Sequence, residues 1–182
     1  MTITAGFATK MLRTTLADYN FWPQSESDSP LSIKRAKQPL DEAAILSRDA
    51  SMRRAAIKAM NPLAPSYKAP ATRRIEYKTL DELFQPLIRN SLTELVGMAT
   101  QGLAMEEPVL PETVFSILMP IEQVEYLTEL YQTFTQLQNT KVIMVHDDDG
   151  DNTSPDAYTT LMIAGESVES EVILAQALLI QT

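Results

Sequence analysis

Apolar positions along the chain follow two periods, and each period predicts a different kind of element. A spacing of three and four residues, typical of amphipathic helices, occurs in residues 4–19, 41–60, 80–90, 92–105 and 120–139. Alternating or continuous runs of β-branched and aromatic residues, typical of strands, occur in residues 73–78, 112–119, 141–146, 157–164 and 171–181. The pattern therefore predicts a protein that mixes helices and strands.

The three C-terminal runs are separated only by short polar loops, which predicts a three-strand antiparallel meander. Residues 171–181 are too apolar for a strand with one face in water, so we expect this strand to be central or covered on both faces. Residues 73–78 alternate apolar and charged side chains, as expected of a strand at a sheet edge. With helices packed on this antiparallel sheet, the predicted fold class is α+β.

The first part of the chain has a different character. Stretches rich in Ser, Asp and Pro separate two amphipathic helices that have no core of their own. We therefore predict a long N-terminal arm (residues 1–78), mostly extended or helical, ahead of a compact α+β domain (residues 79–182).

Charge divides at the same point. Residues 1–78 hold 13 of the 15 Lys and Arg but 7 of the 24 Asp and Glu, so they carry +6 and the remainder carries −15. A basic arm on an acidic domain indicates an interaction, either with an external partner or with the protein's own acidic part. Ordering such an arm costs about 1 to 2 kcal/mol per residue in backbone entropy. We therefore expect the arm to take its shape from a surface on which it lies.

Candidate partner-binding residues lie in this arm. The aromatic pair Phe21 and Trp22 is typical of interface anchors, although Trp22 would serve equally well to cover the protein's own sheet. The candidate cations are Lys34, Arg35, Lys37, Arg48, Arg53, Arg54, Lys58, Arg73 and Arg74. Basic side chains also bind phosphates, but an acidic domain repels a polyanion and few aromatic residues accompany these cations. A protein partner is therefore favoured over nucleic acid.

The stretch "VHDDDGD" (residues 145–151) is the most suggestive site for chemistry. Imidazole and carboxylate groups together suit several divalent metals, so the candidate ligands are His146, Asp147, Asp149 and Asp151. The spacing fails the helix-loop-helix calcium pattern, because Val145 stands where the pattern needs an acidic ligand and no bidentate Glu closes the loop. The simpler interpretation is a solvated acidic turn between two strands.

Composition excludes several classes of function. The chain has no cysteine, which rules out disulfides, thiol nucleophiles and thiolate metal sites. It has a single histidine, no phosphate-binding glycine loop and no apolar run of membrane-spanning length. We therefore expect no cofactor, no transmembrane segment and an intracellular, cytoplasmic protein. The Thr-rich start with Lys10 and Arg13 leaves an organelle-targeting segment as the alternative.

These observations predict a non-enzymatic interaction or assembly protein, a subunit of a larger complex on which the basic arm docks while the acidic domain presents a binding surface. The alternative is a small inhibitory or ligand-binding regulatory domain whose acidic surface mimics a polyanion. A third hypothesis is a metal-dependent enzyme that uses the His146 cluster.

Overall fold

The computed structural model describes residues 2–25, 30–63, 72–104, 111–147 and 158–180. The elements follow in the order α1 (Ala5–Asp18), β1 (Ser32–Ala36), α2 (Glu42–Met60), β2 (Arg73–Lys78), α3 (Leu80–Ala104), α4 (Pro111–Thr135), β3 (Gln138–Asp147), β4 (Tyr158–Glu166) and β5 (Val172–Ile180). The protein is thus α+β, as predicted.

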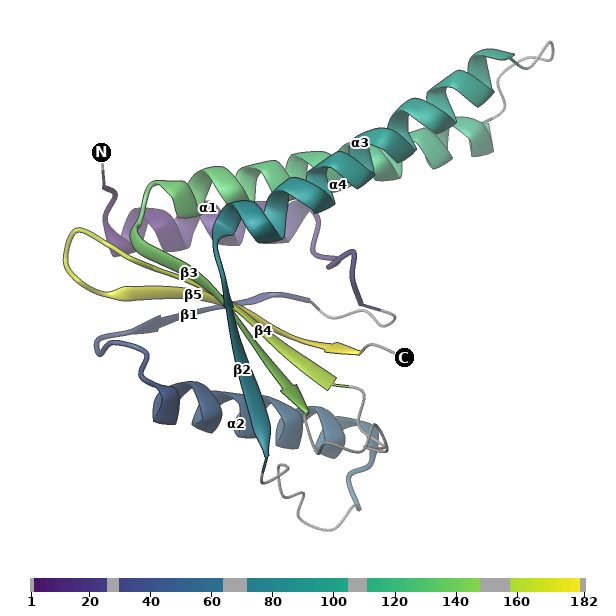
Figure 1. Cartoon of the computed structure of the whole chain (residues 1–182). Helices are drawn as coiled ribbons and strands as arrows, with labels where there is room; N and C mark the ends of the chain where they lie inside the picture. Colours follow the sequence, from purple (N-terminus) through teal and green to yellow (C-terminus); the bar gives the residue numbers. More distant parts are fainter. Residues whose placement is uncertain (1, 26–29, 64–71, 105–110, 148–157, 181–182) are drawn as a thin grey trace.

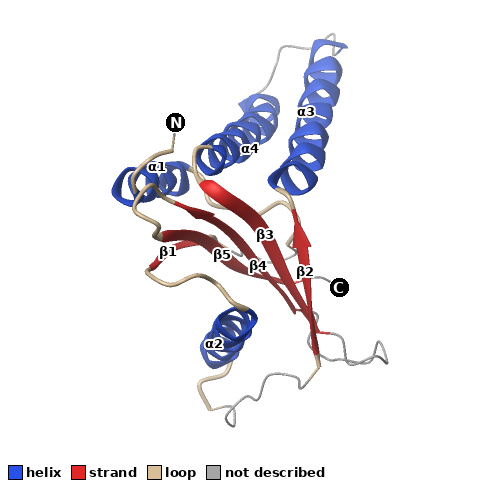
Figure 2. Cartoon of the chain, turned by 60° about the vertical axis from the view of Figure 1, so that its left-hand side comes forward, coloured by secondary structure: helices blue, strands red, loops and turns tan. Residues whose placement is uncertain are grey.

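The five strands form one antiparallel sheet in the order β1-β5-β4-β3-β2. The C-terminal meander β3-β4-β5 is confirmed, β5 lies between two neighbours as expected, and β2 is an edge strand as expected. Helices α1, α3 and α4 cover one face of the sheet, and α2 lies on the other face (Figures 1 and 2). The sheet is therefore the middle layer of three.

Strand alternation explains why the central strands are apolar on both faces. In β3, Val142 and Met144 belong to the core under α1, α3 and α4, whereas Ile143 and Val145 belong to the smaller core under α2. Because successive side chains of a strand point to opposite faces, a strand covered on both sides needs an apolar residue at every position.

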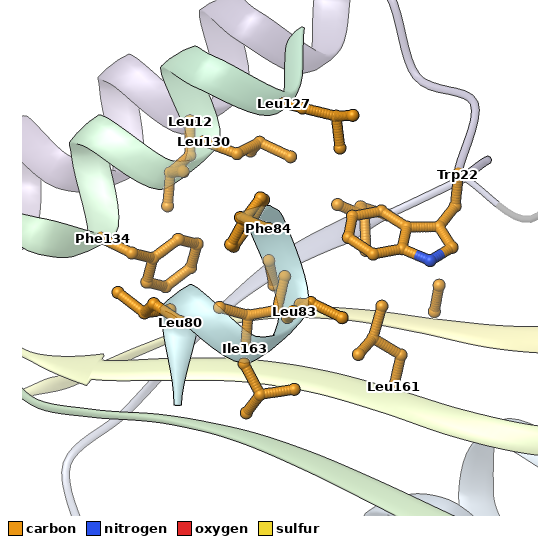
Figure 3. Close-up of a cluster of buried hydrophobic side chains, with 14 of the residues drawn as sticks. Leu12, Trp22, Leu80, Leu83, Phe84, Leu127, Leu130, Phe134, Leu161 and Ile163 are labelled. Atoms are coloured by element: carbon orange, nitrogen blue, oxygen red, sulfur yellow. The ribbon is translucent and has the colours of Figure 1, made fainter. Parts of the chain in front are cut away.

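The main core joins the N-terminal part of the chain to the C-terminal sheet. Leu12 of α1, Phe84 of α3 and Phe134 of α4 are fully buried there above Ile163 of β4. Trp22 packs edge-on against Phe84, with ring centroids 6.1 Å apart. Figure 3 shows these side chains converging between the helices and the sheet.

The structure differs from the predicted N-terminal arm. β1 pairs with β5 from Ser32 to Ala36, and α1 buries its apolar stripe against the same core as α3 and α4. Described residues on both sides of Lys78 therefore share one sheet. The amphipathic helices find the surface that they need on the protein's own sheet, which was the second of the two outcomes considered for the basic segment.

One predicted strand and one predicted helix boundary are also corrected. Residues 112–119 were expected to form a strand but belong to α4, and the expected helices 80–90 and 92–105 are one helix, α3. Pro86 and Pro120 lie inside these helices, where each removes one backbone hydrogen bond. The long antiparallel packing of α3 on α4 outweighs these local signals. A capping box starts α3, since Thr79 N donates to Glu82 Oε2 at 2.7 Å and Glu82 N donates to Thr79 Oγ1 at 3.2 Å.

The α3–α4 hairpin is longer than the sheet that it covers (Figures 1 and 2). The core residues of α3 end at Leu87 and those of α4 begin at Tyr126. We call residues 92–104 of α3 and 111–119 of α4 the distal hairpin. Its α3 part alone is about 20 Å long at 1.5 Å per residue, so it extends well past the core.

Candidate protein-binding surface

Of the four predicted metal ligands, the structure describes His146 and Asp147, which lie on opposite faces of the sheet. His146 Nε2 lies 2.9 Å from Glu76 Oε2 on the face of α1, α3 and α4, whereas Asp147 Oδ2 accepts from Arg53 Nη1 at 2.6 Å on the α2 face. Asp149 and Asp151 lie outside the described residues. Within the described ranges, no group of three His, Asp or Glu side chains is placed to hold a metal ion.

Two of the predicted partner-binding cations are instead structural. Arg53 is fully buried and donates to Asp49 Oδ1 at 2.7 Å and to the Val145 carbonyl at 3.2 Å, which fixes α2 to the sheet. Arg73 donates to Asp49 Oδ2 at 2.5 Å, and Thr160 donates to Asp49 Oδ1 at 2.7 Å. Buried charges need such partners, so the fully buried Arg53 is not available to another molecule, and Arg73, whose side chain is 15% exposed, is paired with Asp49.

The other predicted cations do not form one surface. They are spread over β1, α2, β2 and the turn after β1: Lys34, Arg35, Lys37, Arg48, Arg54, Lys58 and Arg74. Arg35 is paired with Glu171, and Arg74 Nη1 lies 3.9 Å from Glu76 Oε2. The acidic C-terminal half of the chain therefore neutralises Arg35, whereas the carboxylate near Arg74 belongs to the same basic segment.

The predicted aromatic pair has divided roles. Trp22 is 3% exposed and belongs to the core, which agrees with the alternative that it covers the protein's own sheet. Phe21 is 52% exposed and packs edge-on against Tyr19, with ring centroids 5.3 Å apart. Phe21 is thus accessible, and its role as a partner anchor stays a prediction.

Apolar side chains are exposed along the distal hairpin. Of the ten large apolar side chains that are exposed among the described residues, five lie there: Leu92, Val96, Val114, Leu118 and Met119. Val96 is 64% and Met119 is 63% exposed. Leu92 and Val96 are one turn apart on α3, and Val114 and Leu118 are one turn apart on α4, so each pair shares a helix face. Clustered apolar exposure of this kind marks interaction sites.

The hairpin is also uniformly acidic. Between Asn90 and Lys141 the sequence has seven Glu and no Lys, Arg or His. Glu122 and Glu125 are exposed on α4, four and seven residues after Leu118, so they continue the Leu118 face of that helix. Apolar side chains are thus flanked by carboxylates that no basic residue of the hairpin neutralises.

An aromatic cluster connects the hairpin to the body of the protein. Tyr126 of α4 is buried, and its ring centroid lies 5.2 Å from that of Tyr19, at the C-cap of α1. Burial raises the pKa of the Tyr19 phenol, and the nearby carboxylates of Glu122 and Glu94 raise it further. Glu94 of α3 and Glu122 of α4 are 28 positions apart in the sequence, on the two helices of the hairpin.

Two shallow hollows flank α1. The larger, about 500 Å³, lies between α1 and Arg35 of β1, and the smaller, about 350 Å³, lies between α1 and Glu129 of α4. Neither hollow is lined by His146, the chain's only histidine. Among the described residues, the hollows do not place an imidazole base beside a hydroxyl nucleophile.

Sequence reasoning missed the distal hairpin because it interpreted residues 112–119 as a strand. The signal that was available is the absence of positive charge from Ser91 to Thr140, combined with apolar residues on more than one helix face. A helix with an extra exposed apolar stripe is typical of a surface that another element covers.

None of the helices in the described part of the chain is long and apolar enough to cross a membrane. Comparison with protein-family models gives no match, and no curated protein shows significant sequence similarity to the chain.

Proposed function

We propose that this protein is a non-enzymatic interaction domain that binds another protein through the distal hairpin. The observation that supports the proposal is the exposure of Leu92, Val96, Val114, Leu118 and Met119 on the part of the hairpin beyond the core. Burying one such side chain fully contributes about 1.5 to 3 kcal/mol. The fold does not gain this free energy at the exposed parts of the five side chains. A partner that covers the hairpin would bury these side chains and gain that free energy on binding.

The layout of the hairpin is consistent with this role. The first turns of α3 and the last turns of α4 are fixed by the core around Phe84 and Phe134, so the distal hairpin is presented on a rigid base. Rigid presentation lowers the entropic cost of binding. The predicted docking of a free basic arm is replaced by docking through this acidic and apolar hairpin.

A second candidate is a small inhibitory domain whose acidic surface occupies a basic site on its target. The run of seven Glu without a positive charge favours it. The two candidates differ in which side chains matter. An interaction domain depends on the exposed apolar side chains, whereas a polyanion mimic depends on the carboxylates and tolerates loss of the apolar ones.

The test compares two valines of similar exposure. Val96 is on the distal hairpin, and Val168, 58% exposed, is in the β4–β5 turn. The wild-type chain, Val96→Ser and Val168→Ser are used as baits in extracts of the source cells, and captured proteins are quantified by mass spectrometry. We expect Val96→Ser to lose proteins that wild type and Val168→Ser both retain. Equal capture by all three baits would contradict the proposal.

A further inference from the structure

We propose that the partner inserts a lysine or arginine side chain into a site formed by Tyr19, Phe21, Glu94 and Glu122, which we call the aromatic–acidic site. The inference rests on the proposed function, because it names the chemistry of the partner that covers the hairpin. The inference depends on other residues than the exposed apolar side chains of the hairpin. The inference and the proposed function can therefore fail separately.

The aromatic part of the site is built on the core. Tyr126 is buried in α4, Tyr19 packs on it at 5.2 Å with an interplanar angle of 59°, and Phe21 packs edge-on against Tyr19 at 5.3 Å and 72°. Exposure rises along this series, from the buried Tyr126 through the half-buried Tyr19 to Phe21, which is half exposed. The outermost ring is thus held in place by two others while it remains accessible.

The acidic part comes from both helices of the hairpin. Glu122 is one turn before Tyr126 on α4, so its side chain leaves the helix on the face that carries the Tyr126 ring. The Tyr131 hydroxyl of α4 donates to Asp81 Oδ1 of α3 at 2.6 Å, and in the antiparallel hairpin this register places Glu94 about one turn from Glu122. Burial raises the pKa of the Tyr19 phenol, and the charges of both carboxylates raise it further. Both residues are exposed, and within the described part of the chain neither has an ion pair or hydrogen bond. Two carboxylates therefore converge on one aromatic cluster without a positive charge between them.

This combination fits a basic side chain. A Lys or Arg within about 6 Å of an aromatic ring is attracted by the ring quadrupole, and carboxylates add charge-assisted hydrogen bonds. Within the described ranges, no Lys or Arg of the chain is paired with Glu94 or Glu122, and the sequence between Arg89 and Lys141 has no basic residue. Like charges on a second hairpin would repel, so a second copy docking hairpin to hairpin does not fill the site. A phosphate backbone is repelled for the same reason.

The site is continuous with the apolar surface of the hairpin. Met119, Glu122 and Tyr126 follow one another at spacings of three and four residues along one face of α4. A single partner helix whose apolar face is bordered by basic side chains would contact Met119 with the apolar face and Glu122 with a basic side chain at its border. The partner that the site fits best is therefore a basic amphipathic helix.

The probe for the test is a labelled peptide of Leu and Lys, about 18 residues or five helical turns long, ordered so that the leucines form one face. A second peptide of the same composition in scrambled order, which has no apolar face, is the control. Binding to the full chain is measured by fluorescence anisotropy at low and at physiological salt. The protein variants are Phe21→Ala, Glu94→Gln, Glu122→Gln and Val96→Ser, and Glu42→Gln on α2 is the matched control because it removes the same charge on the opposite side of the sheet.

We expect the ordered peptide to bind more tightly than the scrambled one. Phe21→Ala, Glu94→Gln and Glu122→Gln should each weaken binding by about fivefold, whereas Glu42→Gln should change it by less than about twofold. Equal effects of all three Glu→Gln changes, or equal binding of the two peptides, would show general charge attraction and overturn the inference. If Val96→Ser abolishes binding while Phe21→Ala and the glutamine variants leave it unchanged, the aromatic–acidic site does not bind a cation. The inference then fails, whereas the proposed binding role of the hairpin stands.

Discussion

Arg53 and Asp49 form an ion pair one turn apart on α2, with the Arg53 Nε 2.7 Å from Asp49 Oδ1 and both side chains fully removed from solvent. The pair faces the sheet, where Arg53 also reaches Asp147, Val145 and Tyr158. This contact fixes α2, which has a smaller apolar core than the helices on the other face. This polar network and the smaller apolar core together hold α2 on the sheet.

Replacing Arg53 should therefore destabilise the protein strongly. In Arg53→Ala the buried Asp49 carboxylate loses a partner, and breaking a buried pair in this way costs about 3 to 5 kcal/mol. Arg54→Ala, one position along and exposed, should cost less than about 0.5 kcal/mol. Urea unfolding followed by circular dichroism measures both. Equal stabilities for the two variants would show that α2 is not held by this network.

Phe21 and Trp22 should respond oppositely to truncation. Trp22→Ala removes a buried ring beside Phe84 and should lower the free energy of unfolding by about 3 to 5 kcal/mol. Phe21→Ala removes an exposed ring and should lower it by less than about 1 kcal/mol, which makes Phe21→Ala suitable for binding experiments. Thermal unfolding by circular dichroism provides the comparison. A large loss for Phe21→Ala and a small one for Trp22→Ala would reverse the assignment of anchor and core.

Two glycines give a matched test of the local structure. Gly165 lies in β4, where an added Cβ would come within 2.8 Å of the Leu137 Cβ, so Gly165→Ala should destabilise the protein by about 1 to 3 kcal/mol. Gly97 lies inside α3 with open space around it, so Gly97→Ala should stabilise the helix by about 0.5 to 1 kcal/mol. Denaturant unfolding of the two variants beside wild type measures the change in the free energy of unfolding for each. A destabilising Gly97→Ala would indicate that α3 does not continue through the distal hairpin.

Acid should remove the contribution of the Glu76 carboxylate to the free energy of unfolding. A hydrogen bond with His146, and to a lesser extent contacts with Lys78, hold the pKa of the Glu76 carboxyl below its ordinary value, and burial opposes them. A carboxyl whose pKa is lowered on folding stabilises the protein above its unfolded pKa of about 4.3, and this stabilisation is lost as the pH falls through the lower folded pKa. Because Glu76 is partly exposed, solvent screening keeps the contribution below about 1 kcal/mol.

The measurement compares wild type with Glu76→Gln across the acid range. Wild type should be slightly more stable at pH values above about 5, and the difference should vanish below about pH 3. A difference that grows on acidification would mean that the protonated carboxyl is the form favoured by the fold, contrary to the contacts described.

Much of the fold follows from local patterns, and the failures have identifiable causes. The alternation in residues 73–78 and the continuous apolar character of residues 171–181 reflect their places at the edge and in the interior of the sheet. The strand β1 was not predicted from the sequence. It has only five residues, and Ile33 stands beside charged residues, so the apolar pattern is too short to indicate a strand. Residues 112–119 have strand-like composition, but packing of α4 along α3 decides their conformation, since tertiary contacts override weak β propensity.

The candidate site was less predictable than the fold. Trp22 and Phe21 are adjacent and chemically alike, and only the path of the chain after α1 decides which of them enters the core. The approach of Glu94 to Glu122 depends on the register between α3 and α4, which no local pattern reveals. The charge asymmetry along the chain was real, but its basic half is largely built into the sheet and α2.

Site-specific photocrosslinking tests the binding role of the distal hairpin most directly. A photoreactive benzoylphenylalanine is placed at Met119 on the hairpin or at Leu63 after α2, which is 94% exposed, and the full chain is irradiated in its native cells. We predict a discrete adduct with one partner protein from position 119 and none from position 63. Adducts from position 63 without any from position 119 would contradict the account.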